Sequence, residues 1–143
     1  MSDYRRVKAL RIPICYVNFA KYIPKLKELV SNEDWSDNLA DTLPQVCPEL
    51  FSQYDEVNKF EYTITEGSHY IDYTLEVSRD EEGEYTKHRH LTKQEKSKYE
   101  PIFHKMDDDL DMNRVRLVEY CWYTCSEPPD CYDDINDPFY NEV

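Results

Sequence analysis

Glycine is almost absent from this chain: Gly67 and Gly83 are the only two among 143 residues, and they lie far apart. Phosphate-binding loops, the G-x-G-x-x-G dinucleotide fingerprint and the G-x-S-x-G nucleophile elbow all depend on glycine at fixed positions. Only glycine lets the backbone come close to a phosphate or turn as sharply as these sites require. The scarcity therefore excludes the usual signatures of several large enzyme classes.

The chain also lacks a long apolar run and closely paired cysteines. No stretch approaches the roughly 20 apolar residues of a membrane-spanning helix. The spacing of Cys121, Cys125 and Cys131 does not match a zinc knuckle, which has pairs at short spacing. The first residues have a strand pattern rather than the apolar core of a signal peptide. With five cysteines, an odd number, we expect reduced thiols, a cytoplasmic location and no membrane association.

Positive charge is in short supply. Lys and Arg number 17 against 30 Asp and Glu, a formal net charge of −13. The imbalance is uneven, with a net +5 over residues 1–30 and a net −9 over residues 107–143. A field of this sign repels nucleic acid and speeds association with cationic partners. Apolar residues make up 40% of the chain and 13 residues are tyrosine, so the acidity is not a sign of disorder.

Alternating apolar and polar residues predict a set of strands. Residues 60–65 and 71–77 alternate on either side of a turn at 66–68, which predicts a hairpin with one apolar and one wet face. A third strand is expected at 84–90. Residues 7–17 alternate as well, and Pro13 suggests a sheet edge or a bulge there. Residues 114–124 are apolar on both faces, as in a central strand.

Helical periodicity appears between and after these strands. A helix is expected from about Tyr22, and two short ones within 32–56. Thr92 and Glu95 form a capping-box pattern that opens a further helix, which Pro101 kinks or ends early. Together the patterns predict an α+β fold, with an antiparallel or mixed sheet of about four or five strands and helices on one face. We expect a single domain over 1–124, followed by an acidic, aromatic tail over 125–143.

Residues suited to catalysis or metal binding are sparse. His88 and His90 share one face of a predicted strand, and His69 lies nearby if the strands form a meander, which would suit zinc. Cys47 and Cys125 would act as nucleophiles only with a histidine beside them. The spacing of aspartates over 107–111 resembles the start of a calcium loop, but Met112 takes the glycine position. We therefore expect no enzyme, no bound metal and no cofactor, with a metal-dependent enzyme that uses the three histidines as the alternative.

The acidic run and the tail are the main candidates for binding a partner. Carboxylates clustered along a chain can occupy a basic channel built for phosphates, and aromatic side chains supply buried anchors. A solvated loop and a solubilising tail are the alternatives. The candidate partner-binding residues are Asp107, Asp108, Asp109, Asp111, Asp130, Tyr132, Asp133, Asp134, Asp137, Phe139 and Tyr140.

In small size, acidity, tyrosine content and lack of catalytic motifs, the whole chain resembles phage-encoded anti-CRISPR and anti-restriction proteins. That resemblance implies an inhibitor that binds and blocks a basic nucleic-acid-binding protein, such as a nuclease or CRISPR effector, as a nucleic-acid mimic. It would act in the host cytoplasm and bind no nucleic acid directly. Two other hypotheses stay open: an immunity protein that caps a nuclease toxin, and a module that forms homo-oligomers through its basic first third and acidic last third.

Overall fold

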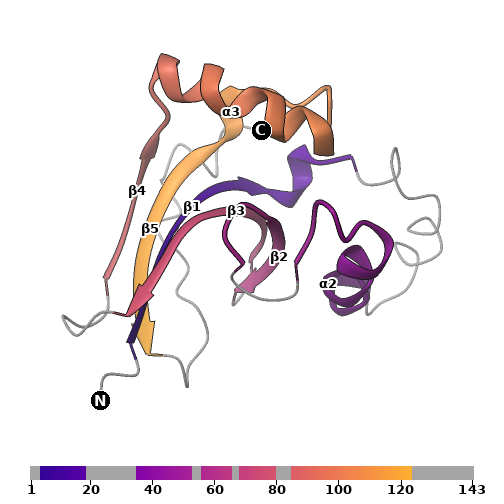
Figure 1. Ribbon diagram of the computed structural model, residues 1–143, viewed down its shortest axis with the longest axis horizontal. Helices are drawn as coiled ribbons and strands as arrows, with labels where there is room; N and C mark the ends of the chain where they lie inside the picture. The colour runs from indigo at the N-terminus through magenta and orange to yellow at the C-terminus, as the bar shows by residue number, and fades with distance from the viewer. Residues whose placement is uncertain (1–3, 19–34, 53–55, 66–67, 80–84, 124–143) are drawn as a thin grey trace.

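The computed structural model describes residues 4–18, 35–52, 56–65, 68–79 and 85–123. Within these ranges five strands form one sheet, accompanied by two α-helices and two short 3-10 helices (Figure 1). The strands are β1 (Tyr4–Pro13), β2 (Phe60–Thr65), β3 (Ser68–Arg79), β4 (Tyr85–His90) and β5 (Arg116–Tyr123). The helices are α2 (Trp35–Val46), α3 (Lys93–Met106), η1 (Ile14–Tyr16) and η3 (Met112–Arg114).

The strand order is β2-β3-β1-β5-β4, and each neighbouring pair is antiparallel. This confirms the expected α+β class and the five-stranded sheet. The hairpin of β2 and β3 is confirmed, and β2 has the expected bounds, but β3 extends beyond the expected 71–77 at both ends. Phe60 lies opposite Tyr73 and Tyr62 opposite Ile71. β5 lies between β1 and β4, so its apolar residues on both faces do indicate an interior strand.

β1 is the middle strand of the sheet, not an edge as the proline suggested. Pro13 is its last residue, and the pairing with β5 ends earlier, at Arg11. A proline at a strand end removes no hydrogen bond from the interior of the ladder, so the sheet tolerates it. The register between β1 and β3 does shift, between Lys8 and Ala9, but the extra residue of this bulge is Leu75 of β3.

The main hydrophobic core lies between the sheet and its helices. Both α-helices contribute to a single cluster with the sheet, so they pack on the same face (Figure 1). Phe103 of α3 makes an edge-to-face contact with Phe60 of β2, with ring centroids 5.1 Å apart. The fully buried members of this core are Leu10, Ile12, Leu39, Leu43, Ile71 and Phe103.

The opposite face of the sheet is buried as well, which corrects the expectation of a wet face on the hairpin. Asp72 and Thr74 are each only 2% exposed. Arg11 of the neighbouring strand is fully buried, and its Nε and Nη2 donate to the two carboxylate oxygens of Asp72 at 2.6 and 2.8 Å. Val7, Ala9, Val118, Tyr70 and Tyr120 form a second apolar cluster on this face.

The positions of the prolines predicted the ends of the two α-helices only in part. α2 is one continuous helix over residues 35–46 of the region 32–56, where two short helices were expected; it contains Pro44 and ends before Pro48. α3 contains Pro101 without ending there. The helix expected from Tyr22 lies outside the described residues. Within the described ranges, neither helix has both the length and the apolar character that crossing a membrane would require.

The capping box at the start of α3 is confirmed. The Thr92 hydroxyl accepts from the Glu95 amide at 3.2 Å, and the Glu95 carboxylate accepts from the Thr92 amide at 2.8 Å. The same carboxylate receives two hydrogen bonds from the Arg89 guanidinium, at 2.7 and 3.0 Å. Chiefly because of Arg89, and then of the Thr92 amide, the pKa of Glu95 falls to about 2.

Replacing Glu95 with glutamine is expected to reduce the free energy of unfolding at pH 7 by about 0.5 kcal/mol, the size of an exposed ion pair. Glutamine keeps the capping bond but loses the charge that pairs with Arg89. Because the folded pKa is depressed, the contribution is complete above the unfolded value near 4.5 and is lost as pH falls toward 2. Urea unfolding at pH 7 and pH 2.5 measures this. A difference between variant and parent that is just as large at pH 2.5 would contradict it.

Candidate functional site

The acidic run forms the loop that joins α3 to η3, and its first aspartate is structural. Asp107 is only 3% exposed. Its Oδ2 accepts from the Asn18 amide and its Oδ1 from the Asp109 amide, both at 3.1 Å. Asp107 was a candidate partner-binding residue, but its carboxylate holds the loop in place, so reversing its charge would disturb the fold.

The other aspartates of the run face solvent. Asp108, Asp109 and Asp111 are exposed. Asp111 also caps η3, since its Oδ1 accepts from the Asn113 amide at 2.9 Å. On the inner side of the loop, His104 Nε2 donates to the Leu110 carbonyl at 3.2 Å. The run thus presents three carboxylates to a partner from a loop that is fixed from within.

One acidic group in the described ranges has metal-ligand spacing. The carboxylates of Asp107, Asp108 and Asp109 all lie within 4.8 Å of one another. Two of the three are exposed, and Asp107 already accepts two backbone hydrogen bonds. Met112, at the glycine position of a calcium loop, is buried in the main core. The Asp107 carboxylate is thus held by hydrogen bonds within the chain.

The candidate residues of the tail lie outside the described residues, as does the expected domain boundary at 124/125. These residues are Asp130, Tyr132, Asp133, Asp134, Asp137, Phe139 and Tyr140. What the sheet does fix is the point from which the tail starts. β5 ends at Tyr123, whose register partner is Tyr4 at the start of β1.

Three acidic segments join the described strands at the same end of the sheet. Arg5 pairs with Arg79 at the end of β3, and Tyr85 at the start of β4 pairs with Cys121 near the end of β5 (Figure 1). Residues 1–3, 80–84 and 124–143 are continuous with these strand ends. Together they contain 11 Asp and Glu and no Lys or Arg. The sheet topology thus gathers their points of attachment at one end.

The described residues themselves are electrically balanced. They hold 14 Lys and Arg and 14 Asp and Glu, which leaves 3 basic and 16 acidic residues in the other segments. The excess negative charge, which is the whole net charge of −13, therefore belongs to residues outside the described ranges.

Residues 80–84 are a candidate that the sequence reasoning missed. Asp80, Glu81 and Glu82 lie between the strands expected at 71–77 and 84–90, Glu84 opens the second of these, and none of the four was assigned to a binding site. Their charge density was visible in the sequence. That this segment attaches at the same end of the sheet as the tail was not visible, because it depends on the arrangement of β3, β4 and β5.

The three histidines do not converge, so the alternative zinc site is wrong. His69 lies on β3 and His88 on β4, with β1 and β5 between them. His69 Nδ1 is hydrogen-bonded to the Tyr62 hydroxyl at 2.7 Å, and Arg116 donates to His88 Nδ1 at 3.1 Å. His90 is exposed at the end of β4.

The Cys47 thiol is not activated. Burial, and secondarily the charge of Glu49, raises the pKa of the Cys47 thiol, which disfavours the nucleophilic thiolate. Cys121 is fully buried, as its place in a strand predicted. Cys125 lies outside the described residues.

Comparisons of the chain with protein-family models, with curated proteins and with solved structures found no match.

Proposed function

We propose that this protein is a non-catalytic inhibitor that binds a basic nucleic-acid-binding protein and blocks the surface on which that protein holds phosphates. A nuclease or CRISPR effector has the required channel, in which Lys and Arg face a backbone with one negative charge per about 1.7 Å of duplex. Carboxylates pair with those side chains as phosphates do. The proposal places the protein in the cytoplasm, where such partners act, and assigns it no direct contact with nucleic acid.

The observation that carries the proposal is the separation of charge. The described residues are neutral overall, and 11 of the 16 remaining carboxylates belong to segments that are continuous with strand ends at one end of the sheet. A protein that needs acidity only for solubility would gain the same benefit from a uniform distribution. Acidic segments that attach at one end would instead give a directional field, which steers a cationic partner toward that end.

The tail also contains the aromatic side chains that such an interface needs. Tyr132, Phe139 and Tyr140 alternate with carboxylates in the sequence. Long-range charge mainly raises the association rate, whereas buried aromatic anchors provide most of the binding energy. The exposed carboxylates of Asp108, Asp109 and Asp111 lie on a different loop and are assigned a supporting role.

The test begins with capture of partners from host lysate on the tagged full chain, followed by elution with DNA or RNA. The purified basic partner is then titrated with two charge-reversal variants: Asp133, Asp134 and Asp137 to Lys, and Asp80, Glu81 and Glu82 to Lys. Each is expected to weaken binding by at least about tenfold at low salt, because it reverses the field at the contact. A third variant, Phe139→Ala with Tyr140→Ala, removes two aromatic side chains and is expected to increase the rate at which the complex dissociates.

The matched control reverses three exposed carboxylates elsewhere, Asp41, Glu49 and Glu100, which changes net charge by the same six units. Its affinity for the partner is expected to stay within about threefold of the parent, since the electrostatic effect depends on where the reversed charges lie as well as on the net charge. Equal weakening by the control would overturn the assignment of the contact to the sheet end. Absence of a basic partner that nucleic acid displaces would overturn the proposed function.

A further inference from the structure

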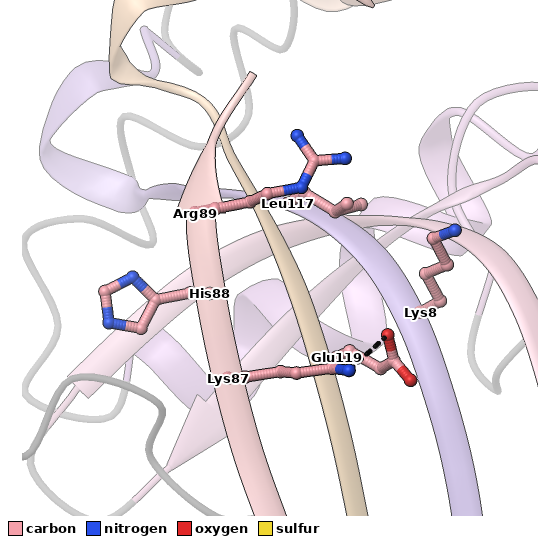
Figure 2. A pocket seen from close by; sticks show the side chains of 6 residues that line it. All are labelled: Lys8, Lys87, His88, Arg89, Leu117 and Glu119. Atoms are coloured by element: carbon pink, nitrogen blue, oxygen red, sulfur yellow. Dashed lines mark ion pairs between the residues drawn. The ribbon is translucent and has the colours of Figure 1, made fainter. Parts of the chain in front are cut away.

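A small cavity with cationic walls lies on the helix-bearing face of the sheet, over β1, β5 and β4 (Figure 2). Its volume is about 270 Å³. Lys8, Lys87 and Arg89 extend their side chains along this face, above Leu117 and Glu119 (Figure 2). His88 also lines the cavity, but its ring points away from the other five side chains (Figure 2).

The sheet register produces this arrangement. Lys8 on β1 is opposite Glu119 on β5, and Glu119 is opposite Lys87 on β4, so a Lys-Glu-Lys row crosses three strands. In the next row Leu117 of β5 is opposite Arg89 of β4. Side chains directly opposite on one face lie close together. The backbone therefore holds the two lysines on either side of a single carboxylate.

That carboxylate is already neutralised. Glu119 forms an ion pair with Arg6 and a second with Lys87, whose ammonium lies 3.6 Å from its Oε2. The Arg89 guanidinium is paired with Glu95. Among the described residues, the Lys8 ammonium has neither an ion-pair nor a hydrogen-bond partner. Of the described side chains that line the cavity, Lys8, Lys87 and Arg89 are cationic and Glu119 is anionic, a formal sum of +2.

We propose that this cavity binds a small phosphate monoester. Near pH 7 a phosphate monoester carries a charge of about −1.5 to −2, which balances the local +2. Lys8 and Lys87 can donate to the phosphate oxygens from two sides. Leu117 provides an apolar floor for the carbon skeleton of the ligand. The volume, just below the roughly 300 Å³ at which drug-sized sites begin, fits a small metabolite or a phosphorylated side chain rather than a polymer.

The inference is independent of the proposed function, since none of the lining residues belongs to the acidic segments. It is tested on the full chain by amide NMR titration at constant ionic strength, with ribose 5-phosphate as the monoester and dimethyl phosphate as a diester. Saturable shifts are expected at Lys8, Lys87, Leu117 and Glu119. The monoester is expected to bind at least about fivefold more tightly, because it has about one more negative charge.

Two variants locate the site. Lys8→Met is expected to raise the Kd for ribose 5-phosphate about fivefold by removing a charge-assisted donor, and Lys87→Met by a similar factor. The matched control is Lys98→Met on α3, where the ammonium lies 5.2 Å from the Tyr99 ring; it changes net charge equally and is expected to leave the Kd unchanged.

Three results would overturn the proposal. The first is shifts of equal size at the exposed lysines of α3, which would mean non-specific ion binding. The second is equal affinity for monoester and diester, which would point to a nucleic-acid backbone instead. The third is an unchanged Kd in both Lys8→Met and Lys87→Met, provided that their amide spectra match that of the parent.

Discussion

Replacing Asp72 with asparagine is expected to lower the free energy of unfolding by about 3–5 kcal/mol, the cost of leaving one partner of a buried ion pair uncompensated. The fully buried Arg11 guanidinium holds both carboxylate oxygens, and its Cζ lies 4.8 Å from the Tyr70 ring and 5.3 Å from that of Tyr120. Asparagine keeps the shape but removes the charge. Urea unfolding at pH 7 measures the loss, which is a large part of a typical total of 5–15 kcal/mol.

Two further variants separate charge from packing. The double replacement Arg11→Met with Asp72→Leu removes both charges, so it is expected to be more stable than Asp72→Asn alone. Glu76→Gln on the same strand is the control; Glu76 is exposed, and its loss is expected to stay within about 0.5 kcal/mol. An Asp72→Asn variant that loses less than about 1 kcal/mol would show that the pair is not needed to hold Arg11.

Replacing Phe103 with alanine is expected to cost about 3–5 kcal/mol, because it leaves a cavity where α3 meets the sheet. The side chain is fully buried, and its ring centroid lies 5.1 Å from that of Phe60 and 6.2 Å from that of Tyr73. Alanine has the higher helix propensity, so the loss would come from packing and not from the helix itself. Chemical unfolding followed by circular dichroism measures it.

The control at this position is Phe103→Leu, which fills most of the space and is expected to cost about 1.5 kcal/mol or less. Tyr73 is in contact with Phe103 in this core. Burial, and secondarily the charge of Tyr99, raises the pKa of the Tyr73 hydroxyl. If the alanine and leucine variants were equally stable, the ring contacts would contribute nothing to the docking of α3.

Local patterns in the sequence were sufficient for the elements that neighbouring residues define. The hairpin of β2 and β3 followed from alternation around Gly67, and the start of α3 followed from Thr92 and Glu95. Both features depend on contacts between residues a few positions apart along the chain, so the residues that form the sequence pattern are also the ones that stabilise the structure. The prolines were poorer guides, because Pro44 and Pro101 both lie inside helices.

The candidate site was predictable in its chemistry but not in its arrangement. The acidic run and the histidines were visible in the sequence. That Asp107 is buried while Asp108 and Asp109 are exposed depends on Asn18, 89 residues away from Asp107. Likewise, His69 and His88 are separated because β1 and β5 lie between their strands, an order that no local spacing indicates.

By itself the sequence determined the fold class, the main strands, the start of α3 and the acidity, because these depend on composition and on short-range periodicity. Only the tertiary structure decided which strand is central, that Arg11 and Asp72 are buried together, and that the acidic segments start from one end of the sheet. It also built the cationic cavity from residues of three strands. The physical reason is that strand order and register are set by long-range pairing and by burial on both faces of the sheet, and residue alternation constrains neither.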